Sequence, residues 1–287
     1  MSTPSSGAVR TWVDGAEAGA LTSFDRGLQY GDGLFETMAA VEGGVRFLSL
    51  HLKRLASGCE RLGIEAPPEE LLRREIARAA AGAAPVTVKL ILTRGPALAR
   101  GYAVTGNEHP TRILLRYVRE PAEPAPGAGG VRVRLAQLRL AENPALAGMK
   151  HLNRLEQVLA RLEWDDPEVA EALMLSVSGD LICGTASNLF LVRAGRLMTP
   201  RLDRCGVAGI MREVVGGLAA QAGIDFQKRS LDLEDLKKAE ELFLTNALTG
   251  IRPITETAGR VLAVGPLTRR LQAALAPLLQ HPERAAP

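Results

Sequence analysis

The chain is poor in aromatic residues and in cysteine, and it has no long apolar run. Aromatics make up only 4% of its 287 residues, so Leu, Val, Ile and Ala must fill the core. The 3 cysteines show no CxxC spacing, which excludes a disulfide framework or a zinc site of that kind and favours a reducing cytoplasm. No apolar stretch approaches the ~18 residues that cross a bilayer, and residues 1–9 lack the apolar segment of a signal peptide. We therefore expect a cytoplasmic protein with no membrane partner.

The charge pattern argues against nucleic acid as a partner. The formal net charge is only +3, and the arginines are scattered rather than grouped in runs. The 4 histidines show no metal-ligand spacing, and neither a GxxxxGK[ST] nor a GxGxxG motif occurs. A small-molecule ligand, no nucleic acid and no metal are expected.

Hydrophobic periodicity predicts a mixture of helices and strands without strict alternation, which favours an α+β fold over a doubly wound sheet. Three prolines and three glycines within residues 119–130 predict a linker between domains at 1–118 and 131–287. The expected helices cover residues 47–62, 69–81, 153–162, 210–221, 233–239 and 267–279. The expected strands cover residues 86–93, 112–118, 131–136, 172–177, 189–193 and 241–245.

Lys150 is the most informative residue of the chain. It follows a stretch of small and apolar residues, Pro144-Ala145-Leu146-Ala147-Gly148-Met149. Burial disfavours the charged form of an amine, and a neutral amine condenses with aldehydes to form a Schiff base. The alternative is an ordinary lysine at the end of a strand.

Two further segments carry the chemistry needed to bind phosphate. Arg54 lies on the polar face of the first predicted helix, where a guanidinium group either grips phosphate oxygens or contributes to a solvated charged face. Residues 206–212 form a turn of small residues that opens a helix, and the unpartnered N–H groups of a helix start attract anions. An ordinary helix start remains the alternative for that turn.

Six motifs together resemble one family, the fold-type IV pyridoxal-phosphate enzymes, over residues 12–279. The family includes branched-chain aminotransferases, D-amino acid aminotransferases and aminodeoxychorismate lyases. The motifs are, in chain order, Asp25 to Thr37, His51 to Leu55, Lys150 to Leu155, Thr185 to Phe190, Gly206 to Arg212 and Thr245 to Ile254.

The resemblance implies a two-domain α+β homodimer that binds pyridoxal 5'-phosphate. It makes Lys150 the catalytic residue and the attachment point of the cofactor, and it makes Arg54 a ligand of the cofactor phosphate. The other cofactor-binding residues implied are Cys183, Gly209, Ile210, Met211, Asn246 and Ala247.

Cys183 departs from the usual pattern of the family, which places a glutamate five residues before the Asn188-Leu189-Phe190 string. That glutamate keeps the cofactor's pyridine nitrogen protonated, whereas a thiol is a weak donor without a carboxylate's charge. The departure disfavours aminotransfer more than elimination, although a packed structural cysteine is also compatible with it.

The strings at residues 25–36 and 150–159 look most like the lyases, which release 4-aminobenzoate and pyruvate on the way to folate. The alternatives are a D-amino acid or branched-chain aminotransferase and a non-catalytic cofactor-binding protein.

A substrate of that class carries two carboxylates and so requires fixed cations. Arg94, Arg100 and Tyr102 surround two glycines in residues 93–102 and are candidates for these contacts, as is Tyr30 through its motif. A mobile surface loop is the alternative for residues 93–102.

Borohydride reduction of the cofactor-loaded protein, followed by peptide mapping, is expected to place the reduced label on Lys150. Only an amine bonded to the cofactor aldehyde is trapped in this way. A label on Lys53 or Lys89 would show that the site is assigned to the wrong lysine.

Overall fold

The computed structural model describes residues 9–42, 44–98, 100–119 and 129–284, which form two compact units. The first unit comprises the described residues of Met1–Pro121, Lys150–Asn153 and His281–Pro287. The second comprises those of Ala122–Met149 and Arg154–Gln280. Most of the predicted linker, residues 120–128, lies outside the described residues. The sequence-based division differs in that it assigns both Lys150–Asn153 and the segment that begins at His281 to the second domain.

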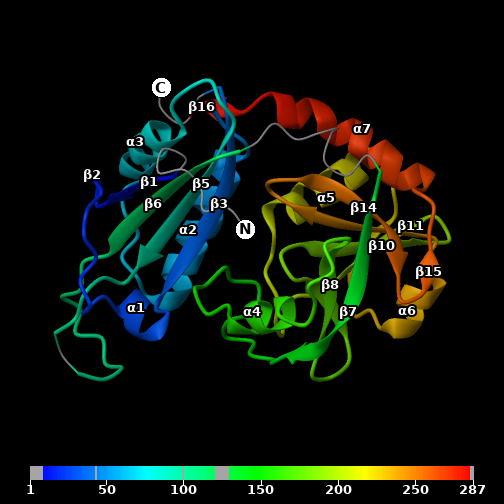
Figure 1. The fold of residues 1–287 in the computed structure, drawn as a ribbon, viewed down its shortest axis with the longest axis horizontal. Helices are drawn as coiled ribbons and strands as arrows, with labels where there is room; N and C mark the ends of the chain where they lie inside the picture. The colour runs from blue at the N-terminus through cyan, green and yellow to red at the C-terminus, as the bar shows by residue number, and fades with distance from the viewer. Residues whose placement is uncertain (1–8, 43, 99, 120–128, 285–287) are drawn as a thin grey trace. The chain divides into compact units, whose positions relative to one another are not determined.

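The first unit is built on an antiparallel sheet with the strand order β16-β4-β3-β5-β6-β1-β2. Helices α2 and α3 pack against the sheet strands β3, β5 and β6 (Figure 1). The elements are β1 (Val9–Val13), β2 (Ala16–Glu17), α1 (Arg26–Tyr30), β3 (Gly33–Val41), β4 (Gly44–Val45), α2 (Leu48–Leu62), α3 (Glu69–Ala80), β5 (Val86–Thr93), β6 (Thr111–Val118) and β16 (Glu283–Arg284).

Local patterns explain the central elements of this unit. In β5, Val86, Val88 and Leu90 alternate on the buried face, as the period of two in a strand requires. In α2, buried residues recur every three or four positions, and the helix ends at Gly63. The glycine takes the left-handed conformation at φ 60°, and its N–H bonds the carbonyls of Cys59 and Glu60.

Two distant segments complete the sheet of the first unit. The Lys150–Asn153 segment lies along β3, where the Phe35 N–H bonds the Lys150 carbonyl and the Leu152 N–H bonds the Gly33 carbonyl, both at 3.0 Å. Strand β16 pairs with β4 near the end of the chain. Both pairings join residues far apart in sequence, and for that reason local periodicity does not predict them.

The second unit contains a mixed sheet that closes on itself. Its order is β12-β11-β10-β13-β14-β7-β8-β9, and β9 also pairs with β10. The elements are β7 (Val131–Leu140), α4 (Leu155–Arg161), β8 (Val169–Ser176), β9 (Leu181–Gly184), β10 (Asn188–Arg193), β11 (Arg196–Pro200), α5 (Ile210–Gln221), β12 (Phe226–Arg229), α6 (Leu233–Lys238), β13 (Glu241–Asn246), β14 (Gly250–Thr257), β15 (Arg260–Val261) and α7 (Pro266–Gln280).

Leucine rather than aromatic residues fills the interior of this sheet. The core cluster includes four fully buried leucines, Leu173, Leu189, Leu191 and Leu244. This composition agrees with the low aromatic content of the chain. In the described part of the chain, no helix is long and apolar enough to cross a membrane.

Candidate active site

Lys150 is held at the edge of β3 with its amine against an aromatic ring. The Nζ atom lies 4.0 Å from the centre of the Phe35 ring, and Lys89 Nζ lies 5.2 Å from the same ring. The backbone bond between Phe35 and the Lys150 carbonyl fixes the start of this segment. The predicted lysine is therefore partly enclosed and has an aromatic neighbour that the sequence did not indicate.

The next residue of β3, Glu36, organises Arg54. Glu36 is 1% exposed, and its Oε1 accepts a hydrogen bond from Arg54 Nε at 2.7 Å, while Arg54 Nη2 bonds the other oxygen. His51, one turn before Arg54 on α2, approaches Glu36 Oε2 with Nδ1 at 2.6 Å. A carboxylate only accepts, so Nδ1 of His51 carries the proton that it donates. The fork of Arg54 is thus fixed in one orientation.

These bonds set the charge state of Glu36. Burial alone raises the pKa of this carboxyl, but the hydrogen bonds from His51 and Arg54 and the charge of Arg54 outweigh burial and lower the pKa to about 2. Glu36 is therefore ionised at any physiological pH. The sequence predicted a role for Arg54 but did not show that Glu36 and His51 hold it in place. A carboxylate within the apolar pattern of β3 was the feature that could have indicated this.

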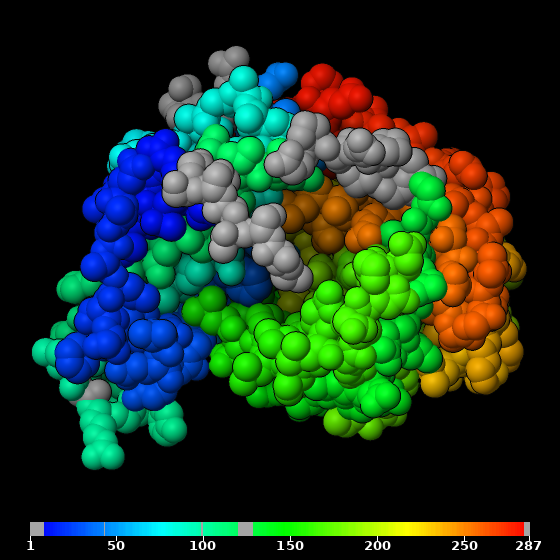
Figure 2. Space-filling model, viewed as in Figure 1, coloured from blue at the N-terminus to red at the C-terminus, as the bar shows by residue number. Residues whose placement is uncertain are grey.

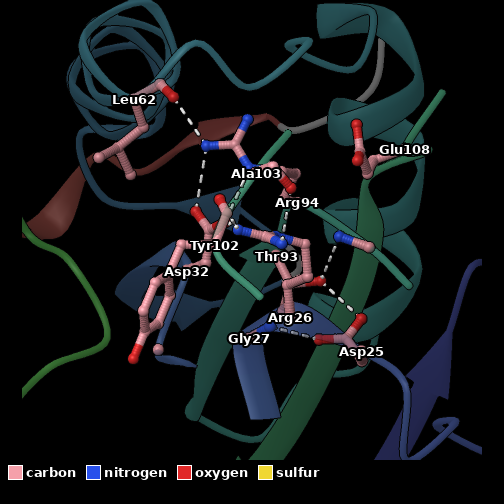
Figure 3. Close-up of polar contacts among 12 residues, drawn as sticks. Asp25, Arg26, Gly27, Asp32, Leu62, Thr93, Arg94, Tyr102, Ala103 and Glu108 are labelled. Atoms are coloured by element: carbon pink, nitrogen blue, oxygen red, sulfur yellow. Dashed lines mark hydrogen bonds and ion pairs between the residues drawn. The ribbon is translucent and has the colours of Figure 1, made fainter. Parts of the chain in front are cut away.

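A second cluster of charges shapes the motif that begins at Asp25. In Figure 3 the guanidinium groups of Arg26 and Arg94 converge on Asp32, with Nε to Oδ2 distances of 2.9 and 2.7 Å. Burial raises the pKa of Asp32, but hydrogen bonds from both arginines lower it overall. Asp25 caps α1 by accepting from the Gly27 N–H, and its other oxygen accepts from the Thr93 hydroxyl.

These contacts favour a structural role for Arg94 over the predicted substrate contact. Arg94 is 7% exposed, and besides Asp32 it donates to the carbonyls of Leu62 and Gly63 at 2.7 Å. All three of its nitrogens therefore bond groups of the protein itself. The sequence could not reveal this because the partners are backbone carbonyls 31 and 32 residues away.

The other predicted substrate residues lie toward the surface. Tyr30 and Tyr102 are brought together, with ring centres 5.3 Å apart in an edge-on arrangement. Arg26 holds the Tyr102 carbonyl at 3.1 Å, so this part of the loop is tied to α1. The Tyr102 side chain is 82% exposed, and Arg100 is exposed as well. Figure 2 shows the segment around residue 100, in teal, protruding from the surface of the first unit.

In the second unit, residues 206–211 form a tight connection into α5. Gly148 pairs with Val207, since its N–H bonds the Gly206 carbonyl and its carbonyl accepts from the Ala208 N–H, both at 2.9 Å. Lys150 follows Gly148 by two residues in the chain. Helix α5 begins after Gly209, which provides no side-chain cap. The N–H groups of Ile210 and Met211 thus open the helix at its positive end, as an anion site requires.

The structure gives Gly209 another role than the predicted one of a backbone donor to phosphate. Its N–H donates to Asn188 Oδ1 at 3.1 Å, and a Cβ at this position would lie only 2.1 Å from the same oxygen. Gly209 therefore allows the close approach of Asn188. The donors that remain for an anion are those of Ile210 and Met211.

Asn246 and Ala247 lie at the turn between β13 and β14. The Asn246 Oδ1 accepts from the backbone N–H groups of Leu248 and Thr249, at 3.0 and 2.9 Å. The side chain of Asn246 thus shapes the turn. Its predicted contribution to phosphate binding would come from the backbone of the turn.

Cys183 is buried in β9 next to Met174 of β8 and Asn188 of β10. Burial, followed by the neighbouring Cys205 and Glu171, raises the pKa of its thiol to about 12. The group therefore stays neutral at physiological pH, and it cannot supply the charge of a carboxylate.

Comparisons with known proteins agree with this architecture. The family model for amino-transferase class IV matches residues 33–257. An aminodeoxychorismate lyase from Vibrio harveyi is 33% identical over 91% of this chain and 97% of its own length. A putative branched-chain-amino-acid aminotransferase from Methanocaldococcus jannaschii is also 33% identical, over 91% of each chain. The crystal structure of 4-amino-4-deoxychorismate lyase from Pseudomonas aeruginosa superimposes with a TM-score of 0.89 at 45% identity, covering 94% of this chain and all of that one.

The two units, with a lysine at the edge of β3 and a helix start open to an anion, have the α+β architecture of a fold-type IV enzyme, as predicted. The chain belongs to the class IV amino-transferase family.

Replacing Glu36 with Gln is expected to flatten the acid dependence of stability. The pKa of Glu36 is lowered in the folded state, so its ionised form stabilises the fold. This contribution to the free energy of unfolding is fully present above the ordinary pKa of 4.5 and is lost as the pH falls toward about 2. The urea midpoint of the native chain should fall steeply across this window, and that of Glu36→Gln should start lower and fall less. Glu65→Gln, at an exposed position, should behave as wild type. Parallel curves for Glu36→Gln and wild type would contradict the assignment.

Proposed function

We propose that this protein converts 4-amino-4-deoxychorismate to 4-aminobenzoate and pyruvate with pyridoxal 5'-phosphate as cofactor. The observation that carries the proposal is the buried, neutral thiol of Cys183 at the position where the family usually has a carboxylate. The names of the Vibrio and Pseudomonas relatives, which are both lyases of this substrate, support it.

The residues present fit the cofactor. Lys150 offers an amine for the aldehyde, and it lies over Phe35, where an aromatic surface limits access of water to one side. Arg54, fixed by Glu36, offers a planar cation for the phosphate. In the second unit, the N–H groups of Ile210 and Met211 and the backbone of the turn at Asn246–Ala247 offer neutral donors for a phosphate group.

The reaction needs one proton to be moved between two carbons of the substrate. When bound, the cofactor withdraws electrons from the carbon that bears the amino group. Lys150 Nζ accepts the proton from that carbon as the adjacent carbon–oxygen bond breaks and the ring becomes aromatic. The same amine returns the proton to the methylene carbon of the departing enolpyruvyl group, which leaves as pyruvate. No further oxidant or acceptor is consumed.

Elimination tolerates a neutral Cys183 better than aminotransfer does. We propose that this thiol faces the pyridine nitrogen, where it leaves the ring a weaker electron sink than a glutamate would. Aromatisation of the product drives the elimination, whereas aminotransfer has no such driving force and relies on the sink. The second candidate function is that of an aminotransferase, the activity in the name of the relative from Methanocaldococcus jannaschii.

We propose Tyr30 and Tyr102 as the substrate-facing residues of the first unit, with Arg100 as the cation for a carboxylate. The two rings are already in contact, and the backbone of Tyr102 is tied to Arg26. Unlike Arg94, Arg100 is exposed.

We further propose that the protein works in the cytoplasm as a homodimer. Helix α4 and its C-cap residue Leu162 expose four large apolar side chains, those of Leu155, Val158, Leu159 and Leu162. A row of this kind on one short helix marks a surface for another protein, and a second copy is the partner expected of this family. All three cysteines are free, as a reducing compartment requires. Sedimentation equilibrium that returned the mass of one chain would contradict the dimer.

The direct test is to mix the cofactor-loaded protein with 4-amino-4-deoxychorismate and to measure pyruvate and 4-aminobenzoate. Both products should form in equal amounts without any keto acid. Lys150→Ala should form neither, because it lacks the base. If amino-group exchange with a keto acid occurs and pyruvate does not form, the aminotransferase is the correct function.

Replacing Cys183 with Glu is expected to raise any side aminotransferase activity while changing pyruvate release less. The carboxylate would keep the pyridine nitrogen protonated and so strengthen the electron sink, which the elimination does not require. Pyruvate release and keto-acid-dependent exchange should be assayed separately on both proteins. If both activities are unchanged, Cys183 is only a packing residue.

A further inference from the structure

Glu171 is a buried carboxylate that the proposed reaction does not use. It lies in β8, is 4% exposed, and stands among the apolar residues that make up the strand from Val169 to Leu175. Its Oε2 accepts from the Ala186 N–H at 2.9 Å, its Oε1 accepts from the Ser187 hydroxyl at 2.6 Å, and Arg252 lies 3.6 Å away. A Cβ at Gly184 would lie 2.6 Å from Oε2, so the backbone is shaped around this carboxylate.

The carboxylate sets the direction of a chain of hydrogen bonds. A carboxylate only accepts, so the Ser187 hydroxyl donates to Glu171, and the serine oxygen is left to accept. It accepts from Asn246 Nδ2 at 3.1 Å. The Asn246 Oδ1 consequently faces the turn between β13 and β14, where it takes the N–H groups of Leu248 and Thr249. The charge at Glu171 thereby orients the Asn246 amide.

The neighbouring Asn188 holds the other connection. Its Nδ2 donates to the Val207 carbonyl at 2.8 Å, and its Oδ1 accepts from the Gly209 N–H at 3.1 Å. This clamp spans the three residues that lead into α5. Two consecutive side chains, Ser187 and Asn188, therefore hold two separate backbone segments within the second unit.

We infer that Glu171, Ser187 and Asn188 are positioning residues for the phosphomonoester end of the cofactor. They bind no phosphate themselves. They preset two backbone segments, residues 207–211 and 246–249. The first carries the N–H groups of Ile210 and Met211 that meet the phosphate, and the second carries the donor of the turn at Asn246–Ala247. Glu171 acts on the second segment through Ser187 and Asn246. The inference rests on the cofactor assignment of the proposed function. Backbone donors that are fixed before binding lose little entropy when the ligand arrives, and this preorganisation strengthens cofactor binding.

Glu171→Gln tests the inference with little change of shape. A glutamine amide can donate as well as accept, so Ser187 is no longer forced to donate and the Asn246 amide loses its fixed direction. The dissociation constant of pyridoxal 5'-phosphate, measured by absorbance titration of the cofactor-free protein, should rise about five- to thirtyfold. The dissociation constant of pyridoxal, which lacks the phosphate, should change less than twofold. Glu168→Gln, an exposed glutamate near the same strand, should leave both unchanged.

Three further variants keep the outcome decisive. Ser187→Ala should reproduce the loss because it removes the middle of the hydrogen-bond chain, and Ser187→Thr should restore binding because it retains the hydroxyl. Arg54→Ala serves as the positive control, since loss of a phosphate cation should weaken cofactor binding about ten- to a hundredfold.

These binding measurements test the positioning role separately from the proposed reaction. A loss confined to the phosphorylated cofactor supports the inference. Equal losses for pyridoxal and its phosphate, or no loss in Glu171→Gln and Ser187→Ala, would overturn it even if the protein forms pyruvate. A wild-type protein that binds the cofactor and forms no pyruvate would refute the proposed reaction and leave the inference intact. Failure of the wild-type protein to bind the cofactor would overturn both.

Discussion

Strand β3 is the element on which the first unit depends, because its hydrogen bonds are used on both edges. One edge pairs with the full length of β5, and the other takes the Lys150–Leu152 segment and then β4. Alternation along the strand then separates the tasks of adjacent residues. Phe35 lies under the lysine amine, while Glu36 meets α2 and fixes Arg54. A shift of one residue in register would exchange these faces and separate both groups from their partners.

Carboxylates that are buried or half-buried set the orientation of the functional donors in both units. Glu36 orients Arg54, Asp32 joins Arg26 to Arg94, and Glu171 directs the amide of Asn246 through Ser187. Each carboxylate is satisfied by at least two donors, as burial of a charge requires. The cost of leaving one unsatisfied ensures that the donors take a single arrangement.

Local elements could be predicted from the sequence, and long-range partners could not. The helix at residues 210–221 and the strand at 86–93 agree with the structure to the residue, because their periodicity and end signals lie within the segment itself. The return of Lys150 to the first unit and the pairing of β16 involve partners more than 100 residues away. In the candidate site, the motifs located Lys150, Arg54 and the start of α5. They did not show that Arg94 is committed to backbone carbonyls or that Glu171 lies behind the turn at Asn246, since these facts depend on three-dimensional neighbours.

The pairing of β16 with β4 has a consequence for biosynthesis. Glu283 bonds the backbone N–H and the hydroxyl of Ser49, so the beginning of α2 waits for a residue made 234 positions later. Lys150 likewise reaches β3 only when more than 100 further residues have been translated after Phe35. The amino-terminal portion therefore leaves the ribosome with the edge of β3 open, and such an edge invites pairing with other chains. Its sheet is completed only after Arg284 has been translated, so a chain truncated before β16 would lack the outer strand of the first unit even though most of that unit's residues had been synthesised.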